Sequence, residues 1–341
     1  MNIHDISKLA GVSVATVSRV LNGNANVSEK TKNKVMEIIQ EYNYTPNAFA
    51  RGLGLNTMHT AGILCVDPAD PDACPSLQFA IGYLQRELRK YNMDSLLFCV
   101  GYDMREKEKT LQAMLARRVD AIIMIGSFFV ENNSNNNLCI INAAKTTPIW
   151  LLNGDLPGVP NVYCARCNDE DGAYRATKSL IDAGCKQVVC LHHGNSFSEQ
   201  QKVLGYKRAL LEVGLPVKDG HICDMPSDIR QAQARIEALV QSGITFDGAF
   251  TTEDEMALVL VRYAMSHNIA IPEKLKIVGY QNSKLSKFSL PELSSVDHNI
   301  ESLCVTMAAL LVNQLRGLKA PSVTTTMADI VYRQTLPNPY K

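Results

Sequence analysis

The sequence predicts a small all-α domain at the N-terminus, followed by a larger α/β domain of two doubly wound lobes. Up to about residue 58, apolar residues follow short helical patterns. From residue 60 onward, short apolar runs alternate with amphipathic helical stretches, which is typical of parallel sheets whose strands are joined by helices. The chain has 341 residues, of which 46% are apolar, so two or three domains with a sizeable core are expected.

Three short helices are predicted in the N-terminal domain. The first covers residues 5–10 and ends at Gly11. Ser13 fits the N-cap of the second, because its hydroxyl can accept a hydrogen bond from a free backbone N–H one turn further on. Residues 22–24 end this helix, and Ser28 opens the third. The apolar positions of the three helices are Ile6, Leu9 and Ala10; Val17, Val20 and Leu21; and Val35, Ile38, Ile39 and Tyr42.

Residues 11–23 carry a motif that turns this three-helix pattern into a functional prediction. They read GVSVATVSRVLNG, which closely resembles the DNA-binding signature of the LacI/GalR repressor family. The likeness continues through residues 27–31, VSEKT, and 44–48, YTPNA. Periodicity alone leaves any three-helix bundle as the alternative, and the matched positions favour a helix-turn-helix DNA-binding domain over residues 1–45.

The resemblance implies that the second helix enters the major groove of DNA. It places Val14, Ala15 and Arg19 at the bases and Thr16, Ser18 and Asn22 at phosphates. Arg19 can donate two hydrogen bonds to a guanine, which contributes ~1–3 kcal/mol of discrimination. The alternative for Thr16 and Ser18 is that they are merely solvated helix positions.

Residues 46–58 resemble the family's hinge helix and linker. The resemblance implies that two hinges meet in the minor groove, where an apolar wedge opens a base step. Leu53 falls at the wedge position, and the alternative is an ordinary linker leucine. One reading helix per chain reads half a site, so a homodimer on a palindromic operator is expected, with a tetramer as the higher form. The hinge residues expected to touch DNA are Asn47, Ala48, Arg51 and Leu53.

Residues 59–341 are predicted to form the effector-binding and dimerisation domain. Buried parallel strands are expected at 61–66, 96–100, 121–125, 149–152, 188–191, 248–250 and 277–280. Helices are expected over 76–90, 104–117, 171–183, 199–213, 228–241 and 254–267. Residues 118–122, 205–210, 254–257 and 277–280 resemble the same family. The likeness implies a periplasmic-binding-protein-like fold of two Rossmann-like lobes joined by three crossovers, with an N-lobe of about 59–158 and 292–321 and a C-lobe of about 159–291 and 322–341.

The family binds its effector in the cleft between the lobes, at the carboxyl ends of the strands. Here Lys202 stands in place of arginine, Glu253 in place of asparagine and Gln281 in place of aspartate. The arginine–aspartate pair that clamps a sugar diol is therefore missing. A ligand with both a charged acceptor and a charged donor is expected rather than a neutral hexose, and the alternative is a degenerate cleft that binds nothing specific. The expected ligand contacts are Cys74, Ser76, Ser127, Asn153, Lys202, Met225, Glu253 and Gln281.

Several other functions are argued against. The N-terminus lacks a signal peptide, and no apolar run is long enough to span a membrane, so a cytoplasmic protein with reduced cysteines is expected. Cys164 and Cys167 form a single CxxC without a second pair, which favours buried small hydrophobes over a metal or redox site. Neither a catalytic motif nor a cofactor motif is found. A solute-binding protein or sugar-modifying enzyme on the same scaffold is disfavoured by the DNA-binding signature. Control by a protein partner stays open, since residues 205–210 and 285–293 also resemble the family's catabolite-control branch.

Overall fold

The computed structural model of the chain describes residues 1–21, 26–44, 57–67, 75–101, 103–130 and 137–340. They divide into two compact units, Met1–Thr60 and Ala61–Lys341. Among the described helices, none is long and apolar enough to cross a membrane.

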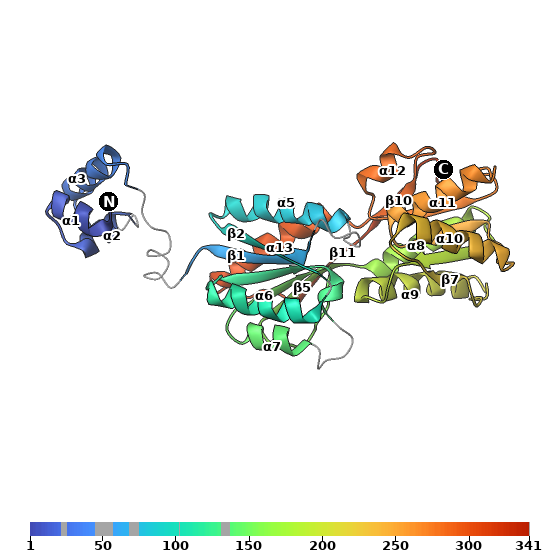
Figure 1. The fold of residues 1–341 in the computed structure, drawn as a ribbon, viewed down its shortest axis with the longest axis horizontal. Helices are drawn as coiled ribbons and strands as arrows, with labels where there is room; N and C mark the ends of the chain where they lie inside the picture. Colours follow the sequence, from blue (N-terminus) through green and yellow to red (C-terminus); the bar gives the residue numbers. More distant parts are fainter. Residues whose placement is uncertain (22–25, 45–56, 68–74, 102, 131–136, 341) are drawn as a thin grey trace. The chain divides into compact units, whose positions relative to one another are not determined.

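The first unit is a bundle of α1 (Ile3–Ala10), α2 (Val14–Leu21) and α3 (Glu29–Glu41) (Figure 1). Gly11 ends α1 with φ of 64°, a left-handed conformation that glycine adopts without strain. Ser28 caps α3 by accepting a hydrogen bond from the backbone N–H of Thr31. The fully or nearly fully buried core is small and consists of Ile6, Ala10, Val17, Val20 and Val35. Leu9, which we expected on the apolar face, is 46% exposed, so the buried face of α1 is narrower than its sequence suggests.

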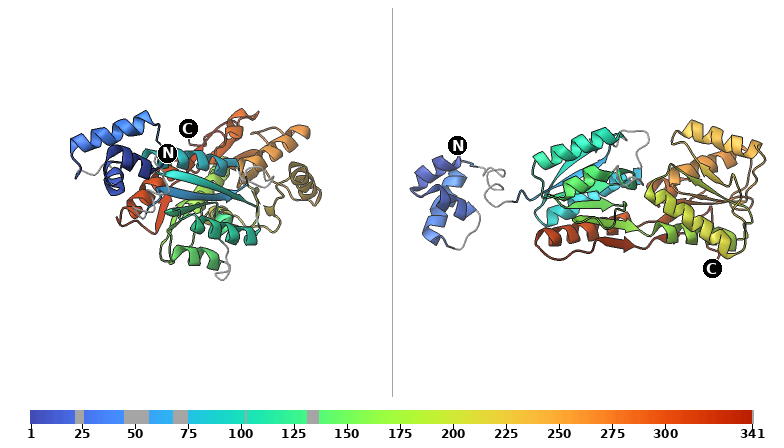
Figure 2. Two further views of the ribbon diagram at one scale, coloured as in Figure 1. Left: turned by 60° about the vertical axis from the view of Figure 1, so that its left-hand side comes forward. Right: turned by 90° about the horizontal axis from the view of Figure 1, so that it is seen from below.

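Two six-stranded sheets are described in the second unit (Figures 1 and 2). The first has the spatial order β11-β5-β4-β3-β1-β2 and the second β12-β10-β9-β8-β6-β7. The strands of the first are β1 (Thr60–Val66), β2 (Asp94–Val100), β3 (Ala121–Ile125), β4 (Ile149–Leu152), β5 (Val162–Cys167) and β11 (Val323–Thr326). Those of the second are β6 (Val188–His192), β7 (Ile222–Asp224), β8 (Gly248–Thr251), β9 (Lys276–Tyr280), β10 (Ser294–Asp297) and β12 (Asp329–Val331). β12 is antiparallel to β10, whereas β8 and β9 pair in parallel.

Helices cover both faces of each sheet. In the first lobe, α5 (Pro75–Lys90) and α13 (Ile300–Leu315) pack on one face, and α6 (Met104–Ala116) and α7 (Leu138–Ala144) on the other. In the second lobe, α8 (Asp169–Asp182) and α9 (Phe197–Glu212) pack on one face, and α10 (Ile229–Gln241) and α11 (Asp254–Ser266) on the other. The remaining short helices are η1 (Ser127–Phe129) and α12 (Lys284–Phe288).

The chain crosses between the lobes three times, as expected, but a few residues later than we predicted at each crossing. β5 and β11 join the first sheet, although we assigned 159–291 and 322–341 to the C-lobe. β10 joins the second sheet, although we assigned 292–321 to the N-lobe. At each crossing the chain first forms one more strand in the lobe that it is leaving, and only then passes to the other lobe. These last strands are β5, β10 and β11.

Most predicted strands and helices match the structure to within one or two residues, but one strand is wrong in its burial. Residues 96–100 were expected to be buried on both faces, whereas β2 lies at a sheet edge and leaves Leu96 and Leu97 39% and 44% exposed. An edge strand with exposed apolar side chains is a candidate contact surface. Eight further elements of the structure are not among the predicted strands and helices: β5, β7, β10, β11, β12, α7, α12 and α13.

Two candidate functional sites

The first candidate site is the outer side of α2. Ser13 caps this helix as predicted, because its Oγ accepts from the backbone N–H of Thr16 at 3.1 Å. Val17 and Val20 turn inward and pack in the core of the first unit. The packing of these two valines therefore fixes which side of the helix faces away from the core.

Two of the predicted base-reading residues, Ala15 and Arg19, lie on that outer side. Ala15 and Arg19 are exposed, whereas Val14 is half-buried. Thr16 is half-buried and its Oγ1 lies 2.9 Å from Ser13 Oγ, so its hydroxyl takes part in the helix cap. Ser18 is half-buried as well. The other residues expected to contact DNA, Asn22, Asn47, Ala48, Arg51 and Leu53, lie outside the described residues.

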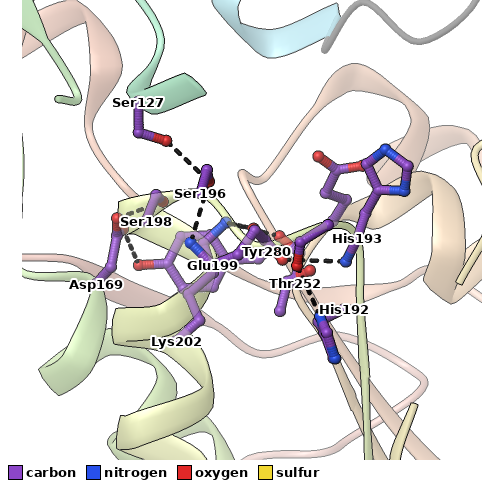
Figure 3. Close-up of polar contacts among 12 residues, drawn as sticks. Ser127, Asp169, His192, His193, Ser196, Ser198, Glu199, Lys202, Thr252 and Tyr280 are labelled. Atoms are coloured by element: carbon purple, nitrogen blue, oxygen red, sulfur yellow. Dashed lines mark hydrogen bonds and ion pairs between the residues drawn. The ribbon is translucent and has the colours of Figure 1, made fainter. Parts of the chain in front are cut away.

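The second candidate site is the contact between the two lobes at the carboxyl ends of their strands. Ser127, after β3, donates a hydrogen bond to Ser196 at 2.9 Å. Asn153, after β4, reaches Ser198 with Nδ2–Oγ at 3.5 Å. Ser196 is the N-cap of α9, so both bonds join the first lobe to the start of one helix in the second. Figure 3 shows the bond between Ser127 and Ser196.

Lys202 is at the centre of this site but is already paired. Its Nζ lies 2.7 Å from Glu199 Oε1 and 3.1 Å from the carbonyl oxygen of Thr252. It also lies 4.7 Å from the centre of the Tyr280 ring, which is a cation–π contact. Burial acts to lower the pKa of Lys202, but the charges of Glu199 and Asp169 outweigh it and raise that pKa above its usual value. Our expectation that Lys202 supplies the charged donor for a ligand is therefore not supported, since its charge is neutralised within the protein.

Asp169 is a second buried charge with a complete set of partners. Its carboxylate accepts hydrogen bonds from Ser198 at 2.6 Å and from Tyr280 at 2.8 Å. Burial raises the pKa of Asp169, while the nearby Lys202 and these two donors act in the opposite direction. Asp169 is the first residue of α8 and thus links the crossover after β5 to the polar cluster.

Three consecutive acidic residues follow β8. Asp254 is fully buried and accepts from the backbone N–H of Ser283 and from Ser295 Oγ, both at 2.6 Å. Glu253 is half-buried, and burial together with the charge on Glu199 raises its pKa to about 7. Its other charged neighbours are Lys202, Glu255 and His193. Burial also raises the pKa of Glu255.

The remaining predicted ligand contacts are only partly brought together. Gln281 lies at the end of β9 and lines a cavity of about 530 Å³ between the lobes, together with Phe79 and Tyr83 of α5. Met225 is instead buried in the apolar cluster of α10 and α11, because its side chain fills the core behind the strand ends. Ser76 lies in the first turn of α5, and Cys74 lies outside the described residues.

Five residues of the site are not among the predicted ones: Glu199, Asp169, Thr252, Tyr280 and Glu255. A usable signal was present for Glu199, which stands three residues after the N-cap Ser196 and three before Lys202. Those spacings put an acid and a base on one helix face, where they can pair. Tyr280 and Asp169 are 111 residues apart, and only the fold shows that they meet.

The cysteines of the CxxC sequence and His193, which follows β6, have structural roles. The ring Nδ1 of His193 lies 2.8 Å from the carbonyl oxygen of Met225, so this half-buried residue is bonded within the second lobe. Cys164 and Cys167 are buried in β5, and burial raises their pKa values to about 11 and about 12. Within the described ranges, no group of three His, Cys, Asp or Glu residues is placed to hold a metal.

Comparisons of the sequence with known proteins identify both units. The profile described as "Bacterial regulatory proteins, lacI family" matches residues 2–47, and that of the "Periplasmic binding protein-like domain" matches residues 177–336. An HTH-type transcriptional regulator of Lachnoclostridium phytofermentans is 42% identical over 335 residues, covering 98% of this chain and 99% of that protein. Catabolite control protein A of Priestia megaterium is 30% identical over 299 residues, 87% of each chain. The transcriptional repressor PurR of Vibrio cholerae is 30% identical over 296 residues, 86% of this chain and 85% of that one.

Solved structures share the fold. The lac repressor dimer bound to operator and the anti-inducer ONPF superimposes with a TM-score of 0.86 at 20% identity, covering 99% of both chains. A complex of the transcriptional regulator CelR with cellobiose gives a TM-score of 0.72 at 22% identity, covering 98% of this chain and 99% of that one.

Proposed function

The chain belongs to the LacI family of bacterial regulatory proteins, and on this premise we propose that it is a transcriptional repressor that binds a palindromic operator as a dimer. In this proposal, a small molecule bound between the two lobes of the large unit controls its affinity for DNA. The relatives named above are transcriptional regulators, and we propose that this chain likewise acts without catalysis.

The observation that carries the proposal is the two-sided character of α2. Val17 and Val20 are buried, while Ala15 and Arg19 are exposed on the side that faces away from the core. A helix held in this way presents the same side chains to every ligand that docks on it, as base readout in the major groove requires. We propose Arg19 as the residue that specifies a guanine, and Val14 and Ala15 as apolar contacts to neighbouring bases.

Dimerisation is supported by apolar side chains that each lobe of the large unit leaves at its surface. Leu96 and Leu97 lie on β2 in the first lobe, and Phe288 and Leu290 lie in or just after α12 in the second, where they are 84% and 76% exposed. Exposed apolar side chains that lie close together on a surface commonly mark protein contacts. We propose that a second copy of the chain covers them; the lac repressor named above, which shares the fold, is a dimer.

The cleft residues that we propose to contact a ligand are Ser127, Asn153, Glu253 and Gln281. They follow β3, β4, β8 and β9, and Ser127 and Asn153 also bond the first lobe to the second. Since a repressor of this kind acts on the chromosome, we propose that the protein works in the cytoplasm.

The function is tested with full-length protein and an operator selected from random double-stranded DNA. Gel-shift titrations at fixed salt compare the selected palindrome with the same duplex in which one half-site is scrambled. We expect the scrambled duplex to lose most of the specific affinity, because each protomer reads one half. Equal affinity for both duplexes would contradict the dimer model, and failure to select any sequence would contradict specific DNA binding.

A further inference from the structure

The ammonium group of Lys202 is already bonded to groups within the protein. The three donors of the Lys202 ammonium face Glu199, the Thr252 carbonyl oxygen and the Tyr280 ring, and both charged side chains are almost completely buried. Figure 3 shows Glu199, Thr252 and Tyr280 around the end of the Lys202 side chain. A phosphate or carboxylate of a ligand would have to displace Glu199 to reach this cation.

The negative charges of the acidic residues at the start of α11 are less well neutralised by neighbouring groups than the charge of Lys202 is. The carboxylates of Asp169 and Asp254 each accept two hydrogen bonds from protein groups. Glu253 makes no side-chain bond to the end of its helix in the described structure. Both carboxylate oxygens of Glu255 are shielded from solvent and accept no hydrogen bond from any other described residue. The cleft therefore holds two carboxylates whose charge is not matched in the way that Glu199 matches Lys202.

A buried hydroxyl beside these carboxylates also lacks a partner. Thr252 is 0% exposed, and its Oγ1 makes no hydrogen bond within the part of the chain that is described. Because buried polar groups are nearly always hydrogen-bonded, an unused oxygen at the carboxyl end of a strand indicates a place for a bound group. Thr252 directly follows β8 and directly precedes Glu253, so both side chains start from the same turn.

The cavity between the lobes reaches the loop after β9, which is bonded to this turn through Asp254. The cavity of about 530 Å³ is lined by Ser283, whose backbone N–H donates to Asp254, and is in the range of small-molecule sites. The charged residues of its lining are Lys284, Lys287, Asp297 and Glu301, two of each sign. Lys284 and Lys287 are exposed, so solvent screens their charge, and they do not neutralise the carboxylates of Glu253 and Glu255, which are not part of this lining.

We propose that the effector is a small hydroxylated organic cation, of the size of an amino sugar, whose primary ammonium group is bound by Glu253 with Glu255 as the second carboxylate. This inference rests on the proposed function, in which the interlobe cleft holds the effector. An ammonium group offers three donors and a positive charge, which suit carboxylates and the free Thr252 hydroxyl. Hydroxyls on the same ligand would meet Ser127, Asn153 and Gln281. A neutral hexose would leave both carboxylates uncompensated, and an anionic sugar would add a third negative charge.

The test is calorimetric and thermal-shift titration of the full-length protein with matched ligands. The amines are glucosamine, galactosamine, mannosamine, serinol and putrescine. The comparison ligands are glucose, galactose, mannose, N-acetylglucosamine, which keeps the nitrogen but loses its charge, and glucose 6-phosphate. We expect at least one amine to bind at least tenfold more tightly than its neutral counterpart. In the Glu253→Gln variant this preference should fall to about one, with a smaller loss in Glu255→Gln. The matched control is Glu273→Gln, an exposed carboxylate outside the cleft, which should keep the preference.

Several results would overturn the proposal: no amine in the panel binding, neutral sugars or glucose 6-phosphate binding as tightly as the amines, or the preference surviving in Glu253→Gln. Mg²⁺ or Ca²⁺ alone giving the same stabilisation, lost in Glu253→Gln, would also overturn it in favour of a metal site. Operator gel shifts with each ligand distinguish a failure of the cationic effector from a failure of control by a cleft ligand. If a neutral or anionic ligand changes operator affinity, the proposed control stands and the cationic effector is wrong. If no ligand of any class changes operator affinity or melting temperature, control by a cleft ligand fails as well.

Discussion

Replacing Lys202 with methionine tests whether the buried charges of the cleft are a structural unit. The substitution keeps the approximate length and apolar stem of the side chain but removes the ammonium that lies 2.7 Å from Glu199. Both partners are almost fully buried, and removing one partner of such a pair costs ~3–5 kcal/mol, because the other charge remains buried without compensation. In Lys202→Met, the Glu199 carboxylate would face Asp169 and Glu253, so we expect the upper part of this range.

The reciprocal substitution, Glu199→Gln, should cost less. Lys202 would keep the Thr252 carbonyl oxygen at 3.1 Å, the Tyr280 ring and the charge of Asp169. The expected loss is ~1–3 kcal/mol, that of one impaired buried hydrogen bond to a charged group. The double variant should lose less than the sum of the two single losses, because contacting partners are not additive.

The assay is equilibrium urea unfolding followed by two probes. The single tryptophan, Trp150, is buried in the first lobe and stacks on Tyr163, so its fluorescence follows that lobe. Far-UV circular dichroism follows both lobes, and the difference between the two transitions isolates the second. Lys186→Met, an exposed lysine in the second lobe, is the control and should change stability by no more than about 0.5 kcal/mol.

The reasoning would be refuted if Lys202→Met left stability within about 0.5 kcal/mol of the wild type, or if Glu199→Gln cost more than Lys202→Met. The pH dependence gives a further check. Because the deficit in Lys202→Met comes from carboxylates that repel one another, lowering the pH should protonate them and narrow the gap to the wild type. A gap that is constant from pH 8 to pH 5 would mean that lost packing, and not charge, causes the deficit.

Four further outcomes are expected. Arg19→Ala should cost ~1–3 kcal/mol per half-site on the selected operator and far less on random DNA in gel shifts, whereas an equal loss on both would make Arg19 a phosphate contact. The pKa of Glu253 rises from 4.5 to about 7 on folding, so the folded state binds more protons and wild-type stability should fall as pH rises through that interval. Glu253→Gln should therefore be more stable at pH 8, by up to ~3 kcal/mol, with no gain left at pH 4 in thermal melts. A Cβ at Gly205 would overlap the Glu170 carbonyl oxygen of α8, so Gly205→Ala should destabilise the second lobe by ~1–3 kcal/mol in urea unfolding, and an unchanged midpoint would show that α8 and α9 separate freely. Leu97→Asp and Phe288→Asp should each raise the dimer dissociation constant at least tenfold in analytical ultracentrifugation, and unchanged dimers in both would place the interface elsewhere.

The elements that the sequence predicted well are those whose pattern is local. β3 and β4 are continuous apolar runs that are buried along their whole length, and both bounds of each strand match the prediction. The caps Ser13 and Ser28 follow from side-chain chemistry within one turn and are confirmed. Elements without such a local pattern were not assigned. β11 is VTTT, with no fully buried residue, and exists because it pairs with β5 at the sheet edge.

The site was harder to predict than the fold, because its residues act through neighbours that are distant in sequence. Lys202 lies among the polar residues where the two lobes meet, and its role depends on the Thr252 carbonyl oxygen and the Tyr280 ring, which lie 50 and 78 residues away. Resemblance to a family indicates which positions line the ligand site, and the side chain at each position then suggests what it could bind. The resemblance does not show whether that side chain is already bonded to another residue of the protein. A lysine in place of an arginine suggested a site for an anion, whereas the packed structure makes it half of an internal pair.

The same contacts explain how a ligand could be coupled to the lobes. The first turn of α9 contains Ser198 and Glu199 and is preceded by the N-cap Ser196. Ser196 and Ser198 bond to the first lobe through Ser127 and Asn153, while Glu199 holds Lys202. Since one helical turn carries both sets of bonds, a charge placed beside Glu253 acts on Glu199 and Lys202 and, through the same turn, on the bonds between the lobes. A cleft built only from hydroxyl contacts would transmit such a change weakly, whereas buried charges respond strongly because little solvent screens them. The charge cluster thus gives the cleft a means of sensing the charge of its ligand as well as its shape.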